Sequence, residues 1–408
     1  MVFITIFMDT LAATISTPAL PYYARSFHVN NAAVGYLYAS WSFTSAFCAP
    51  LLGQLSDRFG RRSILLASLA GAGVANLGQA CAGSYWELLG WRAFSGVWAA
   101  VGNSAQVYLS DVCSPTVLPD YMSKLSAVPS LAMTFGPGLG GGLSKFGLNV
   151  PVLVDGALSL VAGGLCWIYL PESPAWASSK SNAQKTAGPS KERASIPWSV
   201  HVLSISSFFG GIYFGTAVSM SAIFLDAKLG FDSLQVGFTF VLSAIATLAT
   251  SIWGTSSIQK LVGLKNCGVL GSLLCALLTV AMALVPGCWP TITLMSLSRV
   301  GLTLRAASNG TILAGFTDAS NRGTIFAEQQ FATNMGRLLG PVVAGHLAVR
   351  DPVVAPWLFG AACCTISALI LWVISMPQVP SRQPTLRGFT DLAGRCLRVS
   401  LRAFQGEF

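Results

Sequence analysis

Gly53-Gln54-Leu55-Ser56-Asp57-Arg58-Phe59-Gly60-Arg61-Arg62 is a short, strongly charged run between two apolar stretches. Arginine and aspartate side chains are too costly to place in hydrocarbon, yet the uncharged stretches on either side are long enough to cross a bilayer. We therefore predict a tight turn at a membrane surface, with glycines at both ends where the backbone bends sharply. The concentration of arginine in so short a turn places it on the cytosolic side.

The composition of the whole chain excludes a soluble protein. Only 10% of its 408 residues are charged, 53% are apolar, and the mean hydropathy is +0.62. So few charges could not give a stable aqueous surface. Apolar stretches of about 20 residues, the length a membrane-crossing helix requires, recur along the chain. We predict twelve such spans, which begin near Phe3, Ala33, Ile64, Trp86, Leu125, Val150, Ser199, Leu234, Gly268, Thr291, Ile325 and Val353.

The positive net charge of +9 orients the protein in its membrane and does not indicate nucleic-acid binding. Most Lys and Arg residues fall in loops that are cytosolic if both termini are inside, as the positive-inside rule predicts. Near the opposite face lie only Arg25, Lys145, Lys228 and Arg350. Within the spans lie Arg92, Arg299, Arg305 and Arg337. We expect a multi-pass membrane protein with cytosolic termini, and no nucleic-acid partner.

The charged turn resembles the loop between helices 2 and 3 of the major facilitator superfamily, whose pattern is G-x-L-x-D-R-x-G-R-R/K. Every position of the pattern is matched, by Gly53, Leu55, Asp57, Arg58, Gly60, Arg61 and Arg62. The resemblance implies an all-α membrane protein, with 12 transmembrane helices in two pseudo-symmetric six-helix bundles. It also implies a cytosolic gate, in which Asp57 faces the start of helix 11 and Arg61 bridges toward Asp111.

Internal repetition supports two related halves. The spacing from Arg92 to Asp111 equals that from Arg299 to Asp318. Residues of the first half recur in the second at a nearly constant offset along the chain: Gly35 corresponds to Gly237, and Gly136-Pro137 corresponds to Gly340-Pro341. The second copy of the charged turn is degenerate, because Lys260 replaces the acid. We predict bundles at 1–171 and 197–376, a cytosolic linker at 172–196 and a basic amphipathic tail at 377–408; the alternative for the tail is a disordered segment.

Asp9 in the first span is the main candidate for proton coupling. It precedes Pro18 and Pro21 in a pattern, Asp-x8-Pro-x2-Pro, that resembles the first helix of the tetracycline-efflux and drug:proton antiporter branch. A carboxylate inside a membrane is costly unless it is paired or faces water, and low dielectric favours its protonated form. The alternative is that Asp9 lies near the cytosolic rim and only pairs with a neighbouring arginine.

The glycine-rich fifth span carries a second resemblance to that branch. Gly136, Pro137, Gly140 and Gly141 resemble the G-P-x-x-G-G core of the antiporter signature, although glycines in membrane helices also serve close packing. Tetracycline-type exporters place further acids in helices 3 and 9, and the corresponding spans here contain none. Coupling would thus depend on Asp9, with Asp155 as a second acid, and tetracycline itself is a poor candidate solute.

We predict a secondary transporter of a small organic solute that works by alternating access, with proton-linked export as the first interpretation. The partners would then be the solute, protons and membrane lipid, and we expect a monomer. The alternatives are an organic-anion facilitator or symporter, and a non-transporting receptor or scaffold. The first alternative depends on four arginines within the spans, Arg92, Arg299, Arg305 and Arg337, which outnumber the acids there. An anionic group on the solute would balance this excess positive charge, so we expect the solute to carry one. No nucleophile–base pair, metal cluster or phosphate loop indicates an enzyme, a metal or a cofactor.

Overall fold

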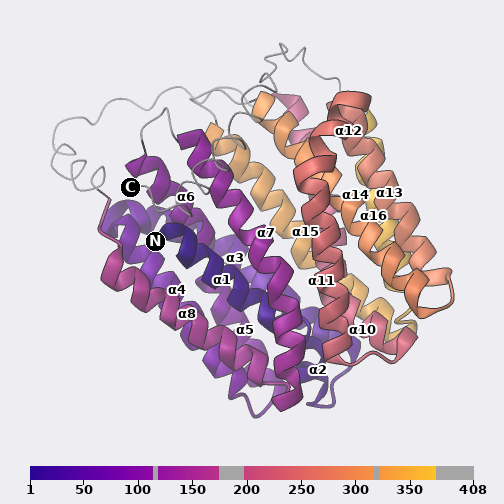
Figure 1. The fold of residues 1–408 in the computed structure, drawn as a ribbon, viewed down its shortest axis with the longest axis horizontal. Coiled ribbons are helices and arrows are strands. Elements are labelled where there is room, and N and C mark those ends of the chain that lie inside the picture. The colour runs from indigo at the N-terminus through magenta and orange to yellow at the C-terminus, as the bar shows by residue number, and fades with distance from the viewer. Residues whose placement is uncertain (114–117, 174–196, 317–321, 374–408) are drawn as a thin grey trace, which may run out of the picture. The chain divides into compact units, whose positions relative to one another are not determined.

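The computed structural model describes residues 1–113, 118–173, 197–316 and 322–373, whose regular elements are all helices. The N-terminal part holds α1 (Val2–Ser16), α2 (Leu20–Arg25), α3 (Asn31–Phe59), α4 (Arg61–Ala80), α5 (Tyr85–Val97), α6 (Val101–Val112), α7 (Leu118–Leu143), the short η1 (Ser144–Phe146) and α8 (Val150–Tyr169). The C-terminal part holds α10 (Trp198–Leu229), α11 (Ser233–Ala249), the π-helical η2 (Thr250–Gly254), α12 (Thr255–Val262), α13 (Leu264–Leu284), α14 (Cys288–Gly315), α15 (Arg322–Arg350) and α16 (Ala355–Val373). Figure 1 shows these helices running side by side.

Each of the twelve predicted spans is helical in the described residues, but three of them are interrupted. The first divides into α1 and α2 around Pro18, which has no N–H for a helical hydrogen bond. The fourth divides into α5 and α6, where Trp98 packs against Gly71 of α4. At this break the N–H groups of Trp98 and Ala99 bond the carbonyls three residues earlier, as in a 3₁₀-helix. The eighth continues from α11 through η2 into α12. Within the described ranges, six helical stretches are long and apolar enough to cross a membrane by length and composition alone.

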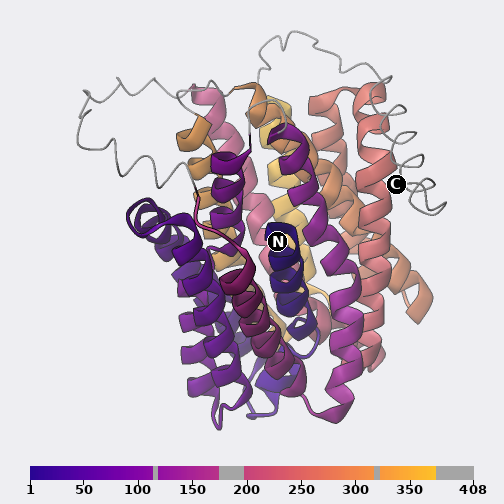
Figure 2. The ribbon, with the colours of Figure 1, turned by 60° about the vertical axis from the view of Figure 1, so that its left-hand side comes forward.

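Helix α1 packs between α7 and α8, as both views show (Figures 1 and 2). In the second half α10 occupies the equivalent place, against α15 and α16. The two halves meet through α3 against α15 and α7 against α11. The largest cluster of buried apolar side chains contains residues of both halves, among them Leu20, Val34, Phe224 and Trp357.

The predicted repeat is visible in how the glycines pack. A side chain at Gly35 of α3 would strike the carbonyl oxygen of Pro341 in α15, and one at Gly237 of α11 would strike that of Pro137 in α7. The two contacts between the halves therefore use the same glycine-on-proline approach, which requires a residue without a Cβ. This equivalence matches the pseudo-symmetric arrangement of six-helix bundles.

Two turns mark the opposite ends of this helical assembly. The Gly60 end holds the α3–α4 turn, and the His28 end holds the turn between α2 and α3, where His28 has a φ of 58°. Most of the predicted linker and all of the predicted tail lie outside the described residues, so their boundaries and character stay predictions.

Candidate functional site

The charged turn at the Gly60 end is built around a glycine that no other residue could replace without strain. Gly60 has φ 105°, and a Cβ there would press on the Glu172 carboxylate. Glu172 Oε1 accepts a hydrogen bond from the Arg62 backbone N–H (3.0 Å), at the start of α4, where the helix dipole favours an anion. Arg62 Nη2 in turn donates to the Trp167 carbonyl (2.5 Å), so the turn is held against the end of α8.

Arg61 and Asp111 meet as the sequence predicts, with Arg61 Nε 3.0 Å from Asp111 Oδ2. Both side chains are about four-fifths buried, at 17% and 21% exposure. Ser173 Oγ also donates to Asp111 Oδ2 (3.4 Å), and Tyr108 Oη donates to the Pro171 carbonyl (2.9 Å). These contacts join α4 and α6 to the segment after α8, all within the first half. The side chain of Asp57 lies outside the described atoms, so its predicted approach to α15 stays a prediction.

Polar contacts between the halves gather at the His28 end. Arg25 Nη1 lies 2.6 Å from Asp226 Oδ2, and Tyr22 Oη donates to the Phe231 carbonyl (2.7 Å). Between α3 and α15, Asn31 Nδ2 donates to the Ala348 carbonyl (2.8 Å) and Tyr36 Oη lies 3.1 Å from His346 Nε2. At the opposite end, a Cβ on Gly53 would meet no atom within 4 Å. In the described part of the chain, the halves are thus tied together at the His28 end.

Asp9 lies half-buried on α1, and none of the described residues forms a hydrogen bond or ion pair with its carboxylate. The glycines of the predicted antiporter motif hold the neighbouring helix close to α1. A Cβ at Gly136 would strike Thr14 Oγ1, and one at Gly140 would strike the Ile15 carbonyl. Gly141, on another side of α7, packs against α11 of the second half. The motif therefore packs α7 against both α1 and the other half.

A second acid, Asp155 of α8, lies deeper in the first half at 3% exposure. Asn76 Nδ2 donates to Asp155 Oδ1 (2.8 Å), and Gln79 Nε2 donates to Asn76 Oδ1 (2.7 Å). Arg92 acts on Asp155 electrostatically, and Asp155 acts on Asp9. The Arg92 guanidinium lies 5.7 Å from the centre of the Tyr38 ring, and its Nε is buried without a hydrogen-bond partner in the described structure. The first half thus encloses two carboxyl groups and one guanidinium.

The second half encloses three arginines. Arg299 Nη2 donates to Ser221 Oγ (3.2 Å), so it has a neutral partner. The Arg305 guanidinium is buried against Gly210 of α10, and that of Arg337 stacks 4.5 Å from the centre of the Phe214 ring. Arg305 and Arg337 repel each other, and the Nε atom of each is buried without a hydrogen-bond partner among the described residues. This arrangement places two like charges together with no described carboxylate beside them.

Two further contacts of the described structure were not predicted from the sequence. Glu172 belongs to the segment predicted as linker, and its role at the α3–α4 turn appears only in three dimensions. His201 of α10, which belongs to none of the predicted motifs, lies with Nδ1 2.7 Å from Glu328 Oε1 of α15. Within the described ranges, no group of three or more His, Cys, Asp and Glu side chains could hold a metal ion.

Comparison with known proteins identifies the family of this chain. The sequence profile of the Major Facilitator Superfamily matches residues 2–304 and 203–404. The chain is 24% identical to the class C tetracycline resistance protein of Escherichia coli, over 88% of this chain and 92% of that protein. It is 23% identical to multidrug resistance protein 1 of Bacillus subtilis strain 168, over 84% and 87% of the two chains. The chain belongs to the Major Facilitator Superfamily, a family of multi-pass membrane transporters.

Solved structures share the fold. The human organic anion transporter MFSD10 superposes with a TM-score of 0.68 at 19% identity, covering 91% of this chain and 97% of that one. The nucleoside transporter NupG superposes with a TM-score of 0.73 at 14% identity, covering 91% and 98%. At these identities the likeness concerns the fold alone.

Proposed function

We propose that this protein exports a small organic solute in exchange for protons. The observation that carries the proposal is Asp9, a carboxyl group within the first helix for which no described residue supplies a hydrogen bond or countercharge. Such a group is stable in low dielectric mainly in its protonated form, and it becomes ionised when water reaches it. The tetracycline and multidrug resistance proteins among the relatives support export as the direction.

Alternating access would proceed through the contacts at the two ends. We assign the Gly60 end to the cytosol, with both termini, because Lys and Arg residues gather in its loops. The ion pair of Arg25 with Asp226 then closes the external side while the cytosolic side is open. On the return step Gly53, Asp57 and Arg58 would close against the second half, and Arg61, Arg62 and Asp111 would hold the turn in position. The division into bundles at 1–171 and 197–376, and a monomeric state, belong to the same proposal.

A second candidate concerns the charge of the solute. The Nε atoms of Arg305 and Arg337 are buried without a hydrogen-bond partner among the described residues and have no described acidic partner, which favours an anion beside them. A carboxylate or phosphate on the solute would supply that charge through forked hydrogen bonds. The relation to a human organic anion transporter is one of fold only, so this candidate depends on the two arginines.

Transport by the purified protein in liposomes tests both candidates. A radiolabelled panel of organic anions, cations and neutral solutes is measured with and without an imposed pH gradient. Accumulation driven by the gradient, for at least one solute, is expected for proton-linked export. Gradient-independent equilibration of anions alone would support a facilitator instead. An absence of transport for every class would favour the receptor or scaffold interpretation.

A further inference from the structure

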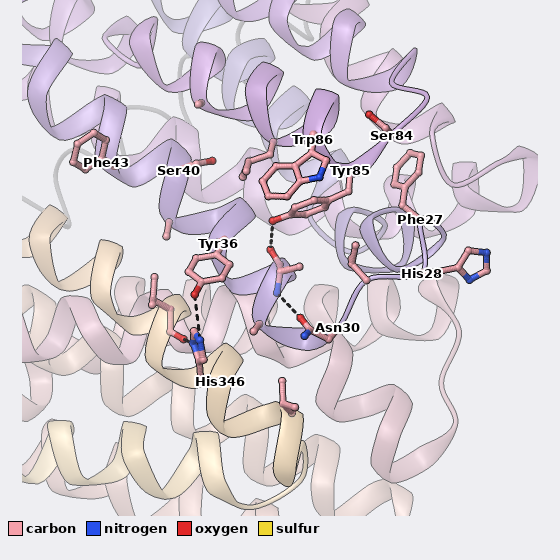
Figure 3. A pocket seen from close by; sticks show the side chains of 18 of the residues that line it. Phe27, His28, Asn30, Tyr36, Ser40, Phe43, Ser84, Tyr85, Trp86 and His346 are labelled. Atoms are coloured by element: carbon pink, nitrogen blue, oxygen red, sulfur yellow. Dashed lines mark hydrogen bonds between the residues drawn. The ribbon is translucent and has the colours of Figure 1, made fainter.

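A groove of about 1730 Å³ lies on the flank of the helical assembly at the His28 end. Its walls come from α3 and α5 of the first half and from α15 of the second half (Figure 3). Asp9, Arg305 and Arg337 do not line it, so it is separate from the proposed transport site. The hydrogen bond of Tyr36 with His346 crosses the groove between the two halves.

The length of the groove matches one leaflet of a bilayer. Its lining on α3 begins in the turn at Ser26 and continues along the helix to Thr44. From Asn30 to Thr44 a helix rises roughly 20 Å at about 1.5 Å per residue. One leaflet contributes about half of a hydrocarbon core of ~30 Å, so this length holds an acyl chain together with part of a headgroup.

The one charged side chain of the lining lies near the turn of the His28 end, and the lining further along the groove is mainly apolar. Near the turn of the His28 end lie Asn30, Ser84 and Arg350. Further along α3 and α5 lie Ala39, Phe43 and Leu89, and the hydroxyl groups of Ser40 and Thr44 also line this stretch. Phe43 and Trp86 are 51% and 75% exposed, which suits side chains in contact with lipid. A single basic group at one end of a mainly apolar groove suits a phospholipid, which has a charged headgroup at one end and a hydrocarbon chain at the other.

Arg350 is the one Lys, Arg, Asp or Glu residue among those that line the groove. Two acids nearby are engaged elsewhere: Glu87 Oε2 accepts from the Gly83 N–H (2.9 Å), and Asp351 Oδ1 accepts from the N–H groups of Val353 (2.9 Å) and Val354 (3.1 Å). No ion pair joins Arg350 to an acid in the described part of the chain. An exposed guanidinium without a carboxylate partner is well suited to a phosphate group.

We infer that the groove binds one phospholipid from the leaflet at the His28 end. Its phosphate lies at Arg350, and an acyl chain lies along Ala39, Phe43 and Leu89. Because both halves form the walls, the bound lipid stabilises the arrangement in which the His28 end is closed. The inference concerns lipid binding and holds whether or not transport is coupled to protons.

The test uses the full chain in detergent with phosphatidylglycerol that carries a photoactivatable diazirine on an acyl chain. Cross-linked peptides are identified by mass spectrometry, and unlabelled phosphatidylglycerol or diacylglycerol with the same chains is added as competitor. Labelling is expected on the α3, α5 and α15 segments of the groove. Phosphatidylglycerol should compete about tenfold better than diacylglycerol, because a charge-assisted hydrogen bond to phosphate is lost in the latter.

Two variants and a control complete the test. Arg350→Gln should weaken labelling about tenfold through the lost phosphate contact, and Ser40→Trp should block the groove. Lys145→Gln, which removes an exposed basic residue of the same end outside the groove, should leave labelling unchanged. If Ser40→Trp fails to fold, Val342→Phe replaces it from the opposite wall. Wild-type labelling in either groove variant, an equal loss in Lys145→Gln, or labelling spread evenly over the helices would overturn the inference.

Discussion

Arg25 Nη1 lies 2.6 Å from Asp226 Oδ2, and this ion pair joins the two halves at the His28 end. Each side chain is about one-third exposed, so the pair stabilises the closed end by less than about 1 kcal/mol. Arg25→Gln is therefore expected to shift the ratio of closed to open molecules by up to about fivefold. Spin labels at Lys145 and Trp289, one in each half, would report the change as a larger population of long distances.

The charge swap Arg25→Asp with Asp226→Arg serves as the control for this prediction. The swapped pair should restore most of the wild-type distance distribution, because the attraction survives with its direction reversed. A distribution that is unchanged in Arg25→Gln would show that apolar packing alone closes this end.

The α3–α4 turn gives a stability prediction with a matched control. Gly60→Ala should destabilise the protein by about 1–3 kcal/mol, because its backbone conformation is one that essentially only glycine adopts; the Cβ would also press on Glu172. Gly53→Ala, whose added Cβ meets no atom within 4 Å, should leave the stability unchanged or slightly higher. Thermal unfolding of the two variants in the same detergent is the measurement. Equal losses in both would contradict the described geometry of the turn.

Asp155, the buried acid of the first half, gives a second stability prediction. Asn76→Ala removes a hydrogen bond to the Asp155 carboxyl group and should cost about 1–3 kcal/mol of stability. Ser68→Ala, on the same helix, removes a buried hydroxyl group that has no hydrogen-bond partner in the described structure, and it should be neutral or stabilising. Unfolding experiments that find Asn76→Ala as stable as Ser68→Ala would remove the argument for a structured site around Asp155.

The arginines of the second half predict opposite effects on folding and on binding. Arg305→Gln or Arg337→Gln relieves the repulsion between the two guanidinium groups, so stability should hold or rise. Binding of an anionic solute should fall by about tenfold or more with the lost charge-assisted hydrogen bonds. Transport assays on anionic and cationic test compounds provide the comparison. If the unmodified protein transports both classes equally well, the proposed anionic group is wrong.

Features that depend on a repeated local pattern could be predicted from the sequence. The spans follow from apolar stretches, and the correspondence of Gly35 with Gly237 anticipated two equivalent helix contacts. The contact of Arg61 with Asp111 followed from a motif that the family resemblance supplied.

Other features could not be predicted because they join residues far apart in the chain. Arg25 and Asp226 are 201 positions apart, and neither belongs to a motif. Glu172 looked like the first residue of a polar linker, yet its carboxylate binds the start of α4. The break between α5 and α6 contains no proline, and Trp98 at the break packs on Gly71, a residue that only the fold brings next to it.

Proton coupling at Asp9 is the central claim, and transport by Asp9→Asn tests it most directly. The variant is reconstituted in liposomes beside the wild type and Asp9→Glu, and solute accumulation is measured with and without a pH gradient. Asp9→Asn should fold and insert normally, but its solute accumulation should be the same with and without the pH gradient. Asp9→Glu should retain at least part of the wild-type response to the gradient. A response to the gradient in Asp9→Asn equal to that of the wild type would contradict the claim and leave Asp9 a structural residue.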